Sequence, residues 1–307
     1  MNNTSATETK STCANCGKGE EAGINLKACM ACKMVKYCSR ECQIAHRPQH
    51  KKACKKRAKE LHGEKLFEQP PPEEDCPICM VQLPSLESVK VYMACCGKVI
   101  CTGCVHAFQS RAIKAKRSKE ENICPFCRTP PPESDEEMIK RCEKRVELND
   151  VRAILNLGSF YSLGSDGLAQ NYAKALELWH RASELGNANA YGEIGVAYRY
   201  GRGVERDEKK AIHYWELAAM GGSVQARHNL GITEEEAGNM DRALKHWMIA
   251  VKDGNSGSLE NIKRLYGYGR ATKDDYANAL KSYQAYLAEV KSDQRDEAAV
   301  ARSGSNY

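Results

Sequence analysis

LELWHRASELG (residues 176–186) returns twice along the chain, as IHYWELAAMGG (212–222) and LKHWMIAVKDG (244–254). Each copy places a tryptophan seven residues before a glycine, and a fourth copy has Tyr283 in the tryptophan position. The successive intervals are 36, 32 and 36 residues. A period in this range, with small residues recurring where helices would cross, is typical of helix pairs stacked in a row. The sequence therefore predicts an all-α solenoid of helix pairs over residues 149–290.

One loop between these copies identifies the repeat more closely. It reads Gly201-Arg-Gly-Val-Glu-Arg-Asp207 and is followed by Lys210, Ala211 and Trp215. This pattern resembles the Sel-1-like repeat, a relative of the tetratricopeptide repeat. The resemblance implies a curved surface that binds other proteins, and hence a scaffolding role.

The segments that flank the repeats are polar. Residues 129–133 predict a linker, and Ser134 with Glu137 forms a capping-box pattern that predicts a helix over 134–148. Cys142 takes the tryptophan position in this helix. The helix is therefore interpreted as a half-repeat that caps the stack, with Cys142 as a small core residue. Residues 291–307 predict a polar tail.

Fifteen of the sixteen cysteines lie between residues 13 and 127, ahead of the repeats. The first residues, MNNTSATETKSTC, are polar and lack an apolar signal core, which predicts a disordered N-terminus over 1–12. No stretch resembles a membrane span of ~20 apolar residues. We therefore expect an intracellular protein, cytoplasmic or nuclear and with no membrane partner. In such a reducing compartment paired cysteines bind metal rather than form disulfides.

The first cysteine series supplies eight potential ligands, enough for two tetrahedral zinc sites. A Cys-x-x-Cys turn lets both thiolates reach one ion, and a spacing of four residues suits one face of a helix. The segment KYCSRECQIAHRPQHKKAC (36–54) therefore predicts a short helical hairpin that carries the later ligands. In chain order the ligands are Cys13, Cys16, Cys29, Cys32, Cys38, Cys42, His50 and Cys54.

This series resembles a MYND finger over residues 13–54. The family pattern Tyr-Cys-Ser-x-x-Cys-Gln corresponds to Tyr37 through Gln43, and the later His-Lys pair begins at His50. His46 is a competing ligand by its spacing, but the family pattern favours His50 and leaves His46 as a surface residue. The resemblance implies two interleaved sites, one formed by Cys13, Cys16, Cys38 and Cys42 and the other by Cys29, Cys32, His50 and Cys54.

MYND fingers also use a groove that binds proline-containing peptides. Gln43 is a common groove residue and is present, whereas Arg47 stands where the family usually has tryptophan. Peptide binding and a purely structural finger therefore both stay open.

Residues 55–75, a basic helix end followed by a proline-rich linker, lead to a second cysteine series over 76–128. This series resembles a RING-type finger, in which alternate pairs share one ion. Lys98 replaces the usual histidine, and a protonated lysine has no lone pair for a metal. Cys95, beside Cys96, is the natural substitute, although a three-ligand or metal-free site stays open. The implied sites are Cys76, Cys79, Cys101 and Cys104 on one ion, and Cys95, Cys96, Cys124 and Cys127 on the other.

A RING-type finger positions a ubiquitin-conjugating enzyme and has no nucleophile of its own. In the family, residues at the positions of Ile78 and Pro125 form an apolar contact with that enzyme, and the residue at Arg128 hydrogen-bonds towards ubiquitin. The tryptophan usual before the last cysteine pair is absent here, which weakens the case for a ligase. The alternative is that Ile78 and Pro125 only shape the zinc turns.

The formal charge of +6 raises the question of nucleic-acid binding. Metal-bound cysteines are thiolates, and we expect four Zn²⁺ ions, two in each finger. Counting fifteen thiolates and four ions changes the net charge from +6 to −1. The basic residues then neutralise the protein's own metal sites, which disfavours nucleic acid as a partner.

No Gly-rich phosphate loop, nucleophile elbow or methyltransferase motif accompanies these modules. The leading interpretation is a zinc-binding scaffold or adaptor for protein–protein interactions, with two zinc-stabilised fingers followed by the solenoid. The alternative is a RING-type ubiquitin ligase whose repeats recruit substrate. Proteins or peptides are the expected partners in both cases, joined by a conjugating enzyme in the second. Metal removal is expected to unfold residues 13–127 and to spare the repeats.

Overall fold

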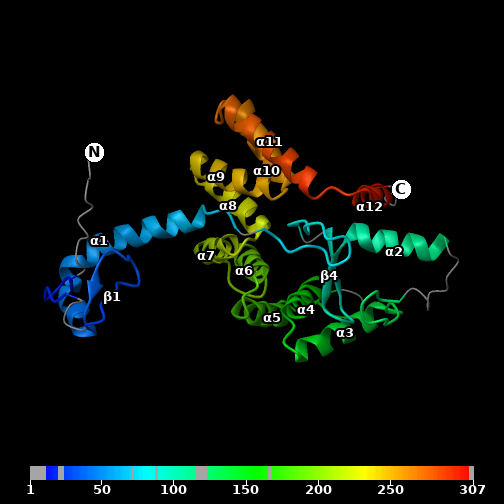
Figure 1. The fold of residues 1–307 in the computed structure, drawn as a ribbon, viewed down its shortest axis with the longest axis horizontal. Coiled ribbons are helices and arrows are strands. Elements are labelled where there is room, and N and C mark those ends of the chain that lie inside the picture. The colour runs from blue at the N-terminus through cyan, green and yellow to red at the C-terminus, as the bar shows by residue number, and fades with distance from the viewer. Residues whose placement is uncertain are drawn as a thin grey trace, which may run out of the picture. The chain divides into compact units, whose positions relative to one another are not determined.

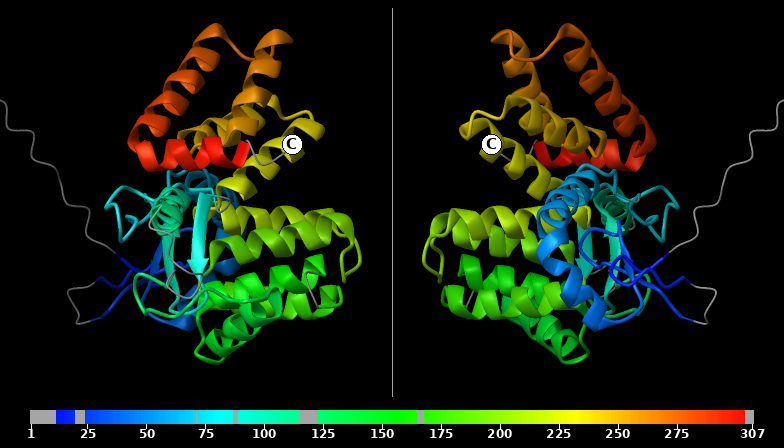
Figure 2. Two further views of the ribbon diagram at one scale, coloured as in Figure 1. Left: turned by 90° about the vertical axis from the view of Figure 1, so that its right-hand side faces the viewer. Right: turned by 90° about the vertical axis from the view of Figure 1, so that its left-hand side faces the viewer.

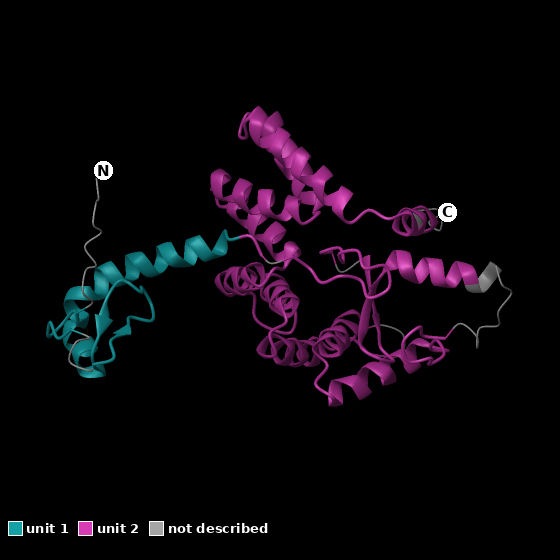
Figure 3. Cartoon of the chain, viewed as in Figure 1, with its two compact units in different colours: residues 1–68 teal, residues 69–307 magenta. Residues whose placement is uncertain are grey.

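The chain divides into two compact units, residues 1–68 and 69–307, in this computed structural model (Figures 1 and 3). The second cysteine series therefore shares a unit with the helical repeats. The expected disordered N-terminus lies outside the described residues, except for Thr12. The structure describes residues 12–19, 24–70, 72–86, 89–114, 123–164 and 168–303.

The first unit consists of a small hairpin and one long helix. Strands β1 (Lys27–Ala28) and β2 (Lys36–Tyr37) pair antiparallel, with Lys27 opposite Tyr37. Helix α1 (Arg40–Leu66) begins after Ser39, whose hydroxyl accepts a hydrogen bond from the Cys42 backbone N–H. Such a side-chain cap satisfies one of the free donors of the first helical turn. The core of this unit consists of Cys13, Leu26, Cys29, Cys32 and Tyr37.

Helix α1 is continuous where the sequence predicts a hairpin of two short helices. Pro48 lies inside it, although proline removes a backbone donor and usually kinks or ends a helix. Cys42 lies before Pro48, and His50 and Cys54 lie after it, four residues or about one turn apart. One helix thus carries potential metal ligands on both sides of Pro48.

The second finger, residues 76–128, forms a hairpin followed by a helix. Strand β3 (Lys90–Met93) pairs antiparallel with β4 (Lys98–Cys101). The connecting turn contains Gly97 at a φ of 76°, a conformation that glycine adopts without strain. Helix α2 (Thr102–Lys114) follows β4 directly, so the pair Cys101 and Cys104 lies at a strand–helix junction.

Helices α3 to α11 follow as an all-α stack in which neighbours along the chain pack together (Figure 1). Most begin at an Asp, Asn or Ser whose side chain accepts a first-turn backbone N–H. Among the described helices, none is both long and apolar enough to cross a membrane. The helices are α3 (Asp135–Glu147), α4 (Val151–Leu163), α5 (Tyr172–Glu184), α6 (Ala188–Tyr200), α7 (Glu208–Met220), α8 (Val224–Glu236), α9 (Met240–Lys252), α10 (Ser256–Gly267) and α11 (Lys273–Glu289).

The repeat tryptophans pack on the glycines that recur in the preceding helix. A Cβ added at Gly195 would lie 2.5 Å from Trp215 Cδ1, and one at Gly231 would lie 2.2 Å from Trp247 Nε1. Trp215 and Trp247 each donate Nε1–H, over 3.2 Å, to the carbonyl three residues before that glycine. The tryptophans are therefore core residues at the helix crossings, where only glycine leaves room for them.

Helix α3 packs on α4, and Cys142 is buried in it. Ser134 Oγ accepts a hydrogen bond from the Glu137 backbone N–H, over 3.2 Å. The return bond differs from the expected capping box, because the Glu137 carboxylate accepts from the backbone N–H of Glu133, over 2.7 Å, and not from that of Ser134. The cap therefore extends one residue further towards the linker.

Residues 291–307 were expected to be a polar tail, but they contain helix α12 (Asp293–Ser303). This helix packs against α2 of the second finger and crosses it (Figures 1 and 2). Arg295 and Ala298 are buried in it. The segment is polar except for the apolar run at residues 298–301, which is too short to predict a packed helix, and the contact with α2 accounts for its order.

Candidate metal centres and binding surfaces

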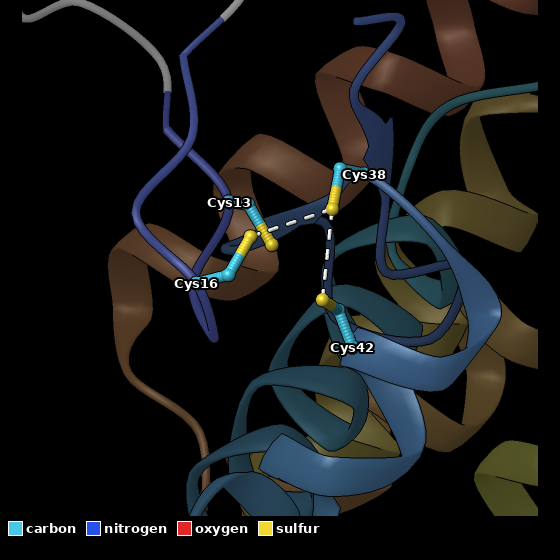
Figure 4. Close-up of side chains that lie close together, drawn as sticks. All are labelled: Cys13, Cys16, Cys38 and Cys42. Atoms are coloured by element: carbon cyan, nitrogen blue, oxygen red, sulfur yellow. Dashed lines mark hydrogen bonds between the residues drawn. The ribbon is translucent and has the colours of Figure 1, made fainter.

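Cluster 1 of the first finger is formed by Cys13, Cys16, Cys38 and Cys42, drawn in Figure 4. All four Sγ atoms lie within 4.8 Å of one another. Cys38 Sγ is 3.5 Å from Cys16 Sγ and 3.5 Å from Cys42 Sγ. Cys38 directly follows β2 and Cys42 lies in the first turn of α1, so the junction between strand and helix sets this geometry.

Cluster 2 combines Cys29, Cys32, His50 and Cys54. Cys29 Sγ lies 3.8 Å from Cys54 Sγ, and Cys32 Sγ lies 3.2 Å from His50 Nε2. His46, the competing candidate, is outside the cluster. Its Nδ1 lies 3.1 Å from the Tyr37 hydroxyl, and its ring stacks on that of His50. His46 therefore supports the orientation of His50 and is not itself among the grouped donors.

The second finger brings its cysteines together in two further interleaved clusters. In cluster 3, Cys76 Sγ lies 3.8 Å from Cys104 Sγ, and Cys79 Sγ lies 3.9 Å from Cys101 Sγ. In the sequence, Cys95 and Cys96 of cluster 4 lie between the two cysteine pairs that form cluster 3. The RING-type arrangement is interleaved in the same way. All four residues of cluster 3 are at least partly buried.

Cluster 4 contains Cys95, Cys96, Cys124 and Cys127. Cys96 Sγ lies 3.8 Å from Cys124 Sγ. Two adjacent cysteines can both take part because they lie in the turn after β3, where the Cys96 N–H donates to the Met93 carbonyl over 3.0 Å. Lys98 is exposed on β4 and is not in the cluster. Cys95 thus lies together with the other three cysteines of cluster 4.

These clusters have the donors and the spacing that zinc requires. Sulfur ligands about 2.3 Å from one tetrahedral ion lie roughly 3.8 Å apart. The sulfur pairs above span 3.5 to 3.9 Å. Thiolate and imidazole donors also favour Zn²⁺ over the hard cations Mg²⁺ and Ca²⁺. The finger and its cysteine clusters therefore support zinc binding.

Local hydrogen bonds favour the thiolate form of some of these cysteines. The backbone N–H of Cys16 is the main cause that lowers the pKa of the Cys13 thiol, to about 6. Thr129 Oγ1 lies 3.1 Å from Cys127 Sγ, and this contact lowers the pKa of Cys127 to about 6. A lowered pKa favours metal binding, because a cysteine must be deprotonated to act as a ligand.

An apolar cavity of about 230 Å³ lies between the second finger, the linker that follows it and helix α3. Ile78, Phe108 and Pro125 all line it, and Ile78 is 43% exposed. Arg128 does not line it and is exposed just after the last cysteine, at a φ of 59°. Sequence reasoning missed Phe108 because it sought an aromatic residue shortly before the last cysteine pair. The available signal was an aromatic residue on α2, four positions after Cys104.

The first finger exposes a mixed surface. Gln43 and Arg47 lie four residues apart on α1, and both are exposed. Met30, Met34 and Ile44 are also exposed on this finger. The finger thus offers polar and apolar side chains to a peptide, with arginine where the family usually has tryptophan.

A groove of about 330 Å³ with mixed polar and apolar lining is formed by α4, α6 and α8, the first helices of successive repeats, together with Ser85 and Leu86 of the second finger. Asn156, Glu193 and Asn229 occupy the same repeat position, two residues before the recurring glycine. Asn189 and Gln225 line the groove one turn earlier, and Gln225 Nε2 donates to Asn229 Oδ1 over 3.1 Å. Burial raises the pKa of the Glu193 carboxyl. The alignment of the repeats already places Asn156, Glu193 and Asn229 at one shared position, but only core residues were predicted from that alignment.

These features define a zinc-finger protein with a helical-repeat body, and comparison with known families agrees. Residues 13–54 match the MYND finger, and residues 151–187 and 188–223 match the Sel1 repeat. The chain therefore carries a MYND finger and Sel1 repeats, which confirms both resemblances inferred from the sequence. The RING-type resemblance rests on clusters 3 and 4 alone.

Several known proteins are similar to parts of the chain. ERAD-associated E3 ubiquitin-protein ligase component HRD3B of Arabidopsis thaliana is 44% identical over 66 residues, 22% of this chain and 11% of that protein. DAP3-binding cell death enhancer 1 of Rattus norvegicus is 29% identical over 116 residues, 36% of this chain and 22% of that protein. The matches thus span only a small part of these relatives. A crystal structure of a Sel1 repeat protein from Oxalobacter formigenes is 26% identical, with a TM-score of 0.44, and covers 48% of this chain and 64% of that one.

Proposed function

We propose that this protein is a zinc-dependent scaffold or adaptor for protein–protein interactions. Each finger would hold two Zn²⁺ ions, one in each of clusters 1 to 4, with His50 as the single nitrogen ligand. Structural zinc of this kind stabilises small modules whose cores bury few apolar side chains. A reducing compartment, cytoplasmic or nuclear, would keep the thiols available as ligands.

The groove on the repeats, with its row of amide side chains, is the observation that carries this proposal. The amide groups of Asn156, Asn229 and Gln225 each offer donors and an acceptor. Such groups suit the backbone N–H and C=O groups of an extended peptide, which alternate along its length. Because the asparagines occupy the same position in different repeats, the groove can contact a partner segment at several points.

Selection of displayed peptides on the full chain tests the proposal. We expect enriched peptides whose affinity falls about 10-fold when Asn156 and Asn229 are both replaced by alanine, a loss of about 1.4 kcal/mol. Asn278→Ala removes an exposed asparagine of α11 outside the groove and is the matched control. Gln43→Ala separates peptides held by the first finger from those held by the repeats. The groove proposal fails if no peptide is enriched, or if the control weakens binding equally.

The alternative function is that of a RING-type ubiquitin ligase. The cavity shared by Ile78, Phe108 and Pro125 favours it, because a small apolar cavity suits a loop of a conjugating enzyme. The Arabidopsis relative is a component of a ubiquitin ligase, and the match covers 11% of that relative. In this role Arg128 would hydrogen-bond towards ubiquitin and the repeats would recruit the substrate.

Autoubiquitination across a panel of conjugating enzymes separates the two functions. A ligase should lose about 10-fold or more of its rate in Ile78→Ala and Phe108→Ala, and Arg128→Ala should also be slower. Met80→Ala is the matched control, since Met80 is 71% exposed nearby but does not line the cavity. No ubiquitin transfer with any enzyme of the panel would leave the scaffold as the function.

A further inference from the structure

Arg295 of helix α12 contacts Cys79 of the second finger, which lies 216 residues earlier in the sequence. Arg295 is only 9% exposed. Its Nη1 donates to the Val290 carbonyl over 2.8 Å, and its Nη2 donates to the Val81 carbonyl over 3.2 Å. The same Nη2 lies 3.8 Å from Cys79 Sγ. The guanidinium is thus fixed against a cysteine of cluster 3.

The backbone of α12 approaches the same cluster closely. A Cβ added at Gly103, at the start of α2, would lie 2.7 Å from the backbone nitrogen of Arg295. Gln294 Oε1 lies 3.7 Å from Cys104 Sγ, and Cys104 is another member of cluster 3. Two consecutive residues of α12 therefore contact two different cysteines of one cluster, and the glycine makes this approach possible.

Charge explains why an arginine is buried at this place. Four thiolates around one Zn²⁺ carry a net charge of about −2. A buried guanidinium is costly unless it is paired and hydrogen-bonded, and a metal–thiolate cluster provides the opposite charge. Groups that hydrogen-bond to metal ligands from outside also set how tightly the metal is held.

We propose that Arg295 is a positioning residue for cluster 3, so that zinc binding by the second finger and docking of α12 stabilise each other. The inference rests on the zinc binding proposed above. Because such coupling is reciprocal, docked α12 slows zinc loss, and zinc loss releases α12. Only three residues separate α11 from α12. Zinc binding or loss at cluster 3 therefore also affects the last helix of the repeats.

The first test asks whether docked α12 slows zinc loss from cluster 3. It uses cysteine alkylation with peptide mass mapping on the full chain in the presence of a weak zinc chelator. In Arg295→Met we expect Cys79 and Cys101 to react about 10-fold faster or more, while the first-finger cysteines react as before. Arg295→Lys should give an intermediate rate, because lysine keeps the charge but lacks the planar fork. Lys291→Met removes a charge from an exposed residue just before α12 and should behave like the unsubstituted protein. Equal rates at Cys79 in Arg295→Met and Lys291→Met would refute the role of Arg295.

Hydrogen exchange tests whether zinc loss releases α12. The experiment uses the unsubstituted protein, so its result does not depend on how a variant folds. As chelator is added, the amides of 293–303 should lose protection in step with the alkylation of Cys79. Retained protection of α12 after Cys79 has reacted would overturn the coupling. Ala298→Glu, which places a charge at a buried position of α12, should raise Cys79 reactivity with Arg295 still present.

The two proposals fail in distinguishable ways. If metal analysis of the unsubstituted protein finds no zinc in the second finger, the zinc proposal fails and the coupling fails with it. If zinc content is full but Cys79 reactivity is unchanged in Arg295→Met, only the role of Arg295 is refuted.

Discussion

The hydroxyl of Tyr92 on β3 donates a hydrogen bond to the Asp150 carboxylate, 2.8 Å away. Asp150 caps helix α4, and Arg145 Nε donates to the same carboxylate oxygen over 2.6 Å. At the other end of the repeats, the Tyr286 hydroxyl accepts from the Ser85 backbone N–H over 3.1 Å. The second finger is therefore bonded to both ends of the helical stack. Loss of its metal should weaken the repeats as well, in contrast to the two independent halves expected from the sequence.

Replacing Tyr92 with phenylalanine tests this connection. The variant removes one hydrogen bond to a partly buried carboxylate, and we expect the free energy of unfolding to fall by about 1–2 kcal/mol. Urea denaturation followed by circular dichroism, with zinc present, measures this change. Tyr268→Phe is the matched control, since Tyr268 is 72% exposed, and it should change stability by less than about 0.5 kcal/mol. Equal stability of the two variants would contradict the proposed connection.

His246 should make the stability of the repeats depend on pH. It is fully buried, and burial, reinforced by Arg227 and Arg242, lowers its pKa to about 3. The unfolded chain takes up this proton near pH 6.5, whereas the folded chain stays neutral there. The unfolded state therefore binds more protons between these values. Stability should fall by about 1.4 kcal/mol for each pH unit below about 6.5.

The comparison of His246→Gln with the unsubstituted protein isolates this effect. Between pH 7.5 and 5.5 the variant should lose about 1.4 kcal/mol less stability in urea denaturation. His213→Gln, on the exposed face of α7, is the matched control and should follow the unsubstituted protein. Metal binding contributes equally to all three profiles, so only their differences matter. Parallel profiles for the two variants would exclude a neutral buried His246 as the cause.

Gly195→Ala tests the packing of tryptophan on glycine. The added methyl group would lie 2.5 Å from Trp215 Cδ1, so the helices must separate, at a cost of about 1–3 kcal/mol. Gly267→Ala is the matched control, because a Cβ there meets no atom within 4 Å and alanine favours helix. Thermal unfolding should show a lower midpoint for Gly195→Ala alone. If both variants melt together, the crossing is not as tight as described.

The sequence predicted the parts of this fold that repeat or bind metal. Trp215 and Trp247 keep a fixed distance to the following glycine, because each repeat must fit the same neighbour. The spacing of Cys-x-x-Cys pairs is set by the geometry of one ion, so each pair could be assigned to a single site from the sequence. The grouping of the pairs into interleaved sites, and the choice of His50 over His46, came from the family resemblance.

Other features depend on contacts that no local pattern contains. Residues 293–303 carry only a short apolar run at 298–301, and their packing involves Arg295 and the space left by Gly103, far away in sequence. Pro48 disfavours a continuous helix, yet α1 continues through it. Phe108 joins Ile78 in one cavity only after the chain has folded around both clusters.

With Cys95 as the fourth ligand of cluster 4, the protein would hold four zinc ions, one in each cluster. Native mass spectrometry of the full chain counts bound zinc directly. We predict four Zn²⁺ ions per chain for the unsubstituted protein and for the control Lys98→Ala, and three for Cys95→Ser. Fewer than four ions in the unsubstituted protein, or four retained in Cys95→Ser, would contradict the account.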